Sequence, residues 1–116
     1  MPNIKSPDLL NGGWRKLAFA HFRDGIEAHW LVKGGAADPT VAVLKYEPGA
    51  KVPRHRHAGL ETIMVLYGVQ SDEAGDYAAG SLVINATGSE HSVWSKNGCV
   101  VLIQWNLPVI ILGDDK

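Results

Sequence analysis

The sequence contains a single cysteine, Cys99, so no disulfide can form within the chain, and a reducing compartment is the simplest expectation. It also lacks an excess of charge of one sign: it has 11 Lys and Arg residues and 12 Asp and Glu residues, which give a formal net charge of -1. A nucleic-acid partner normally requires a basic face, and a membrane-surface anchor requires a polybasic segment. We therefore expect no nucleic-acid partner and no membrane partner.

Long hydrophobic runs are missing as well. The most apolar stretch, residues 100–112, is interrupted by Gln104, Asn106 and Pro108 and is too short to span a bilayer. Residues 1–13 contain no apolar run, so the sequence predicts no secretory signal. Together these absences predict a cytoplasmic location.

Turn-forming residues divide the chain into short segments. The 116 residues include 13 Gly and 6 Pro, and no segment has a long helical period with caps, so we expect one all-β domain over residues 1–116. Short β-rich runs separated by turns favour a closed barrel or jelly roll, since closure removes exposed edges. The predicted strands cover residues 17–22, 26–32, 40–46, 61–67, the hairpin 70–77, then 81–84, 92–94, 100–105 and 109–112.

The chemistry concentrates in a short His-rich segment. In an extended strand, His55 and His57 present their imidazoles on one face, roughly 6–7 Å apart at the backbone. That separation suits two nitrogens converging on one ion at about 2 Å each. Glu61 can return a carboxylate to the same point after a bend at Gly59, and His91 supplies a further nitrogen. These residues predict a metal site.

Three imidazoles and one carboxylate suit Zn²⁺, Fe²⁺, Mn²⁺ or Ni²⁺ better than Ca²⁺ or Mg²⁺. The competing interpretation is a set of scattered surface histidines. Two further candidate ligands, one at the start of a strand and one after a turn, make that interpretation the weaker one. His21 and His29 are interpreted as bystanders: His29 shares a polar face with Glu27, and His21 could face inward as a core histidine.

Two stretches resemble the paired motifs of the cupin superfamily. Residues 49–68 match the first motif: Gly49, five residues, His55-x-His57, three residues, Glu61, six residues, Gly68. Residues 80–95 resemble the second motif through Gly80, Gly88 and His91, with Ala86 where Pro is usual and Ser95 where Asn is usual. The resemblance implies a single cupin (double-stranded β-helix, or jelly-roll) barrel. It also implies the ligand set His55, His57, Glu61 and His91, which neither departure touches.

Within cupins, residues 53–81 look like the ChrR type, the cupin half of an anti-sigma factor that also occurs alone. The resemblance implies a stand-alone metal-binding cupin whose pocket binds a small molecule or an oxidant. One alternative is an iron-dependent dioxygenase of a small oxygenated substrate, such as a diketone or a phenolic ketone. The other is a non-catalytic sensor or regulatory module, which would need a partner protein to contact a sigma factor.

Alternation along the strands predicts the lining of the pocket. If Glu61 faces inward, so do Ile63, Val65 and Tyr67, and Val93 faces inward with His91. An equally weighted interpretation makes these residues simple barrel core. Trp30 and Trp105 are expected in the core or at a subunit contact, and the apolar C-terminal strand is a candidate surface for a homodimer.

Overall fold

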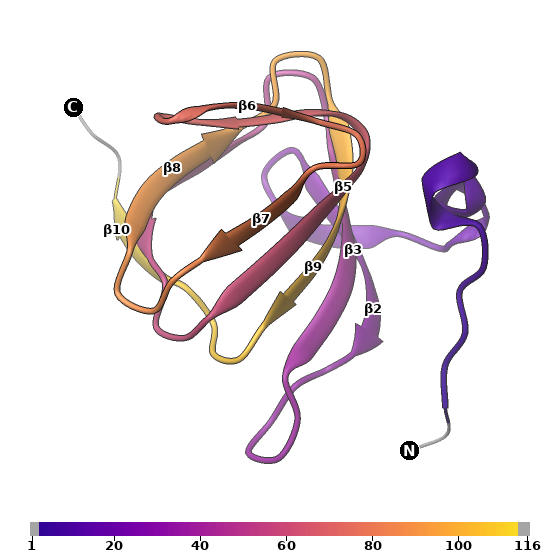
Figure 1. Ribbon diagram of the computed structural model, residues 1–116, viewed down its shortest axis with the longest axis horizontal. Coiled ribbons are helices and arrows are strands. Elements are labelled where there is room, and N and C mark those ends of the chain that lie inside the picture. The colour runs from indigo at the N-terminus through magenta and orange to yellow at the C-terminus, as the bar shows by residue number, and fades with distance from the viewer. Residues whose placement is uncertain (1–2, 114–116) are drawn as a thin grey trace.

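The computed structural model describes residues 3–113 and is almost entirely β-structure (Figure 1). No helix within that range is long and apolar enough to cross a membrane. Two short 3₁₀ helices precede the strands. The elements are η1 (Leu9–Asn11), η2 (Gly13–Lys16), β1 (Ala20–Arg23), β2 (Ile26–Val32), β3 (Thr40–Tyr46), β4 (Lys51–Arg56), β5 (Glu61–Asp72), β6 (Gly75–Ala78), β7 (Leu82–Asn85), β8 (Glu90–Trp94), β9 (Cys99–Trp105) and β10 (Ile110–Gly113).

One curled antiparallel sheet forms a half-barrel, with strands in the order β1-β2-β3-β9-β5-β8-β4-β10 and with β6 and β7 paired to β5. In Figure 1, β8 and β10 lie on one side of the molecule and β2 and β3 on the other, with β5, β7 and β9 between them. The all-β architecture expected from the sequence is confirmed, and similar folds are described below. The predicted strand boundaries hold to within a few residues, except that the first strand begins at Ala20 and residues 61–72 form one continuous strand.

A bulge in β5 decides which of its side chains face inward. Val65 pairs with Val101 on β9. The neighbouring residue of β9, Val100, pairs with Tyr67, so Leu66 is an extra residue without a partner in this ladder. A bulge of this kind reverses the inward and outward alternation beyond it. Before the bulge the odd-numbered residues of β5 face the interior. After it the even-numbered ones do, and this turns Gln70 inward and leaves Tyr67 half exposed.

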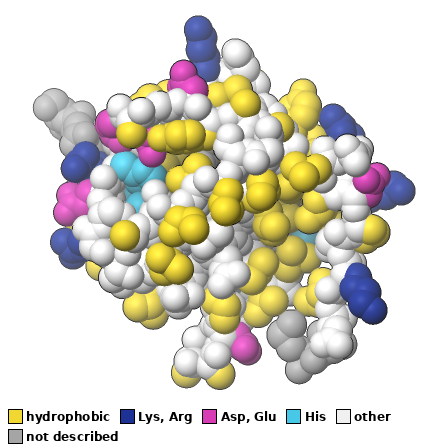
Figure 2. All heavy atoms as spheres, in the orientation of Figure 1, with side chains coloured by type: hydrophobic (Ala, Val, Ile, Leu, Met, Phe, Trp, Pro, Cys, Tyr) yellow, Lys and Arg dark blue, Asp and Glu magenta, His cyan; other side chains and the backbone are white. Residues whose placement is uncertain are grey.

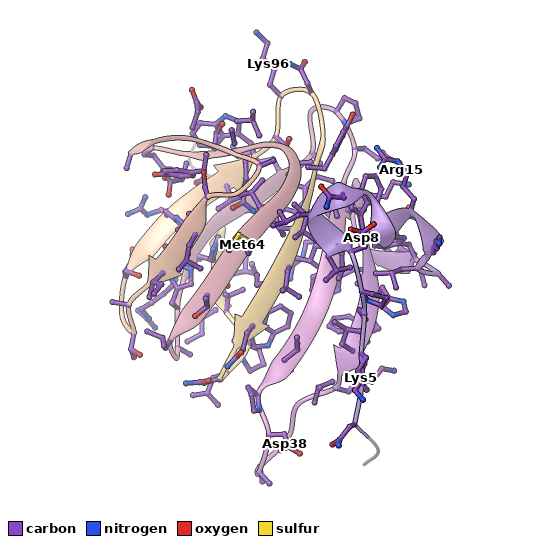
Figure 3. The ribbon with its side chains drawn as sticks, turned by 45° about the vertical axis from the view of Figure 1, so that its right-hand side comes forward. Lys5, Asp8, Arg15, Asp38, Met64 and Lys96 are labelled. Carbon is purple, nitrogen blue, oxygen red and sulfur yellow. The ribbon has the colours of Figure 1, made fainter. Side chains whose placement is uncertain are left out.

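The outer face of β3, β9 and β5 carries its own hydrophobic cluster, which we call the outer cluster. Its buried members are Trp14, Val43, Leu66 and Val100. The 3₁₀ helices hold Trp14 over the sheet, where its ring lies 5.4 Å from that of Tyr67. Figure 3 labels Arg15, which belongs to η2, and Met64 on β5, whose side chain packs against the same cluster.

Candidate metal centre

Three imidazoles meet inside the half-barrel. His55 on β4 is the direct cross-strand partner of His91 on β8, and His57 follows the end of β4. Their ring centroids lie 4.7–5.1 Å apart, and one nitrogen from each lies within 4.8 Å of the others. His55 and His57 from one segment therefore converge with His91 from a distant one, as the sequence predicts.

The other nitrogen of each ring is held by a hydrogen bond. The Nδ1 of His55 donates to the Pro53 carbonyl oxygen at 2.8 Å, and the Nδ1 of His57 lies 3.0 Å from the carbonyl oxygen of Ser89. The Nδ1 of His91 lies 3.1 Å from Oδ2 of Asp72. Since each Nδ1 faces an acceptor, the proton resides there and each Nε2 keeps its lone pair.

Two of the three inward nitrogens make no hydrogen bond within the described residues. The Nε2 atoms of His57 and His91 are buried and make no hydrogen bond. A buried polar atom without a partner costs free energy, so it needs an explanation, and a metal ion that binds there is one of the ordinary ones. Convergent lone pairs with hydrogen-bonded Nδ1 atoms behind them are the arrangement that a metal-binding histidine cluster requires.

Glu61 lies next to one member of this cluster, His57. Its Oε1 is 3.3 Å from Nε2 of His57 and accepts a hydrogen bond from Asn85 Nδ2 at 2.9 Å. Asn85 is the cross-strand partner of Glu61 where β7 pairs with β5. The structure thus groups the three histidines, while the role of Glu61 as a fourth ligand stays a prediction that its position supports.

The hairpin of β5 and β6 contacts His91 and its neighbour Ser92 through Asp72 and Glu73. Beyond its contact with His91, Asp72 accepts hydrogen bonds through Oδ1 from the Tyr77 hydroxyl at 2.8 Å and from the Ala74 amide at 2.9 Å. The Glu73 carboxylate accepts from the Ser92 amide at 3.0 Å. Sequence reasoning missed Asp72, because the inward alternation there depends on the bulge.

Burial and hydrogen bonding set the charges of these groups. Burial lowers the pKa of His55 and so favours the neutral ring that a metal needs. Burial also acts to lower the pKa of His57, but the Glu61 carboxylate outweighs it and the pKa is raised. Burial acts to raise the pKa of Asp72, whereas hydrogen bonds from Tyr77, Ala74 and His91 lower it overall, so this carboxylate remains ionised behind the ring.

A cavity of about 470 Å³ opens beside the histidines, with His55 and Glu61 in its wall. Most of the rest of the wall is apolar, and three aromatic side chains, Phe22, Trp30 and Trp105, pack edge to face or stacked along it. The volume is in the range of small-molecule sites. Trp30 and Trp105, expected in the core or at a subunit contact, are partly buried against the inner core and also line this cavity.

The predicted pocket lining is only partly correct. Ile63 and Val93 line the cavity, and Val65 is fully buried in the inner core without reaching the cavity wall. Tyr67 was wrongly placed, because the bulge turns it outward, where it is 50% exposed against Trp14. The phenol in the wall is Tyr46 from β3.

The two remaining histidines lie outside the site. The Nδ1 of His29 donates to the Ala18 carbonyl oxygen at 2.8 Å, and the ring packs edge to face on Phe19. His21 is exposed on β1, so it is not a core histidine. Figure 2 shows histidine atoms beside acidic ones on one side of the molecule, and hydrophobic side chains spread across the middle of the same face.

Residues 13–107 match the family described as the ChrR cupin-like domain. The anti-sigma-E factor ChrR of Cereibacter sphaeroides is 33% identical over 99 residues, which are 83% of this chain and 43% of that protein. The chain thus spans less than half the length of this curated relative.

Solved structures agree on the fold. The crystal structure of Rhodobacter sphaeroides SigE in complex with the anti-sigma ChrR matches with a TM-score of 0.69 and 27% identity over 78% of this chain and 50% of that one. An acetylacetone dioxygenase from Acinetobacter johnsonii matches with a TM-score of 0.75 and 17% identity over 83% of this chain and 72% of that one. At that identity the second likeness concerns the fold alone.

Proposed function

The chain belongs to the ChrR cupin-like domain family, and from that premise we propose that it holds one divalent metal ion, Zn, Fe, Mn or Ni, and binds a small molecule or oxidant beside it. The ligands in this proposal are His55, His57, His91 and Glu61. The observation that carries it is the convergence of three Nε2 atoms whose Nδ1 atoms are all hydrogen-bonded outward.

The residues fit such an ion by donor type and by location. Three neutral imidazoles and one carboxylate are the donors that first-row transition metals prefer. A bound ion would act as a Lewis acid. If the ion were octahedral, the four protein ligands would leave two positions open for exogenous ligands. His55 and Glu61 lie in the cavity wall, so a molecule in the cavity would lie next to those positions, and the apolar wall would exclude water from it.

Metal analysis of the purified protein tests this proposal. We expect about one equivalent of a divalent transition metal in the wild type and almost none in His55→Ala or His91→Ala. His21→Ala is the matched control, because it removes an exposed histidine outside the site and should keep the full metal content. Equal metal content in all four proteins would refute the ligand assignment.

Catalysis is one form this function can take, and the mostly apolar cavity beside the cluster supports it. In that case the protein is an iron-dependent dioxygenase of a small oxygenated substrate such as a diketone or a phenolic ketone. Oxygen consumption by the iron-loaded protein on adding acetylacetone or a hydroxyacetophenone supports this form. Absence of oxygen uptake with a panel of such compounds counts against it.

A regulatory module is the other form, and the relationship to an anti-sigma factor supports it. The domain would then sense a ligand or an oxidant at its metal and act with a partner protein. Tightly held zinc without turnover would favour this form, whereas rapid turnover of bound ligand would contradict it.

We also propose that the chain forms a homodimer through β10, on which Ile110, Ile111 and Leu112 are each 43–45% exposed. Exposed neighbouring apolar side chains of this kind are commonly covered by a second subunit. A light-scattering mass equal to one chain would contradict the dimer. The expected cytoplasmic location remains a prediction.

A further inference from the structure

Two polar side chains are buried in the cavity wall and take no part in the metal centre. Tyr46 at the end of β3 is 5% exposed, and Gln70 on β5 is 3% exposed. Both line the same cavity as His55 and Glu61. Gln70 reaches the interior only because the β5 bulge reverses the alternation, so this pair depends on a specific local feature of the fold.

The hydrogen bond between the two side chains leaves the Tyr46 hydroxyl hydrogen unused. Gln70 Nε2 donates to the Tyr46 hydroxyl oxygen across a long 3.4 Å contact. The hydroxyl therefore acts as an acceptor there, and within residues 3–113 its own hydrogen meets no acceptor. Burial, with the nearby Cys99 and Glu61, raises the pKa of Tyr46 well above its ordinary value, so the phenol keeps that hydrogen. A buried donor without an acceptor is costly unless a ligand supplies one.

A cation lies at the same end of the cavity. Ile26 pairs with Arg23 on one side and with Tyr46 on the other, so these residues are neighbours across three strands. The Arg23 guanidinium lies 4.6 Å from the centroid of the Phe22 ring, and among the described residues it forms no ion pair. The cavity wall contains one acidic residue, Glu61, which belongs to the metal centre.

We propose that Tyr46, Gln70 and Arg23 form a second polar subsite that binds a carboxylate at the end of the ligand opposite its metal-binding oxygen. The proposal rests on the proposed function and names its ligand class: a small molecule with an apolar, preferably aromatic, body, a metal-binding oxygen function and a carboxylate. The hydroxyl of Tyr46 donates to the carboxylate, Gln70 orients that hydroxyl, and Arg23 supplies charge. The aromatic body lies against Phe22, Trp30 and Trp105.

A matched pair of probes tests this assignment on the cobalt(II)-loaded protein. Both carry the same chelating hydroxyketone: 3-acetyl-4-hydroxybenzoate has a carboxylate where 2-hydroxy-5-methylacetophenone has a methyl group. Binding is measured by calorimetry and by quenching of tryptophan fluorescence, since Trp30 and Trp105 line the cavity. The visible cobalt spectrum reports metal loading independently of either probe.

We expect the wild type to bind the carboxylate probe more tightly than the methyl probe. Tyr46→Phe should weaken the carboxylate probe by about tenfold or more and change the methyl probe by less than about threefold. Arg23→Gln, a change at a partly exposed residue that leaves the core intact, should weaken the carboxylate probe by at least about threefold. Tyr67→Phe removes the same hydroxyl from the outer surface and should change neither affinity.

Two results overturn the subsite. One is a wild type that prefers the methyl probe or binds both equally. The other is a Tyr46→Phe variant that loses affinity for both probes alike or for neither. Failure of the wild type to take up cobalt at the histidines is a separate result, read without any probe, and it overturns the proposed function and this subsite together.

Discussion

The two faces of the central strands β3, β9 and β5 bury side chains in opposite ways. The outer cluster under Trp14 is entirely apolar. The inner face has an equally apolar core around Ile63, Val65 and Val101, but it also carries the buried Tyr46–Gln70 pair and shares the interior with the three histidines of the β4 and β8 side. The outer side of these strands is therefore purely stabilising, whereas the interior that they help enclose contains buried nitrogens of His57 and His91 that make no hydrogen bond.

This contrast separates stability from function within one sheet. Removing an apolar group from the outer cluster should cost folding free energy whatever is bound, because hydrophobic burial does not depend on a ligand. Removing an inward nitrogen should cost stability only when metal is present, because the unpartnered nitrogen destabilises the metal-free fold. Each prediction below tests one side of this contrast.

The largest effect is expected for His91→Ala. The wild type should gain about 4 kcal/mol of unfolding free energy at a metal concentration a thousandfold above Kd, and the variant should gain almost nothing. Chemical denaturation with zinc and with a chelator measures both proteins. A variant that loses stability equally under both conditions would show that His91 is structural.

Trp14→Ala should lower the unfolding free energy by about 3 kcal/mol, with the same loss in the presence and absence of metal. Trp14 is 8% exposed, whereas Leu10, in the same N-terminal segment, is 54% exposed. Leu10→Ala is therefore the control and should change stability by less than about 0.5 kcal/mol. A Trp14→Ala loss that appears only with metal would contradict the separation of the two faces.

Asp72→Ala should lower metal affinity by about 10- to 100-fold, because the carboxylate orients His91 and strengthens its Nε2 as a donor. Asp76→Ala is the control: it removes a carboxylate of the same hairpin that bonds to Ser71 at 2.6 Å instead of to a histidine. Competition with a metal indicator gives both affinities. Equal losses in the two variants would mean that Asp72 acts only by holding the hairpin.

Ser89→Ala should have the smallest effect, below about threefold in metal affinity. The Nδ1 of His57 lies 2.9 Å from the Ser89 hydroxyl oxygen and 3.0 Å from the Ser89 carbonyl oxygen, so one acceptor survives the substitution. The same indicator assay measures it. A loss as large as that of Asp72→Ala would show that the carbonyl alone cannot fix the ring.

The sequence predicted the fold and the convergence of the histidines because both follow from short-range patterns. Glycine-bounded β-rich runs gave the strands, and the spacing of His55, His57 and His91 in the two motifs gave the cluster. What it could not predict depends on pairing between distant strands. Asn85 reaches Glu61 only through the register of β7 on β5.

The bulge in β5 accounts for the main error. Strict alternation places Tyr67 inside, whereas one extra residue at Leu66 turns it out and brings Gln70 and Asp72 in. Gly68, with a φ of 73°, marks the place where the strand departs from regular geometry. A glycine between the predicted strand 61–67 and the predicted hairpin 70–77 is the one local signal that could have indicated the reversal.

A crystal structure of the metal-loaded protein, with an anomalous difference map recorded at the absorption edge of the metal, tests the central claim most directly. We expect one peak inside the half-barrel, about 2.0–2.2 Å from Nε2 of His55, His57 and His91 and from a carboxylate oxygen of Glu61. A fully loaded crystal with its peak elsewhere, or with these nitrogens turned away from the ion, would contradict the account.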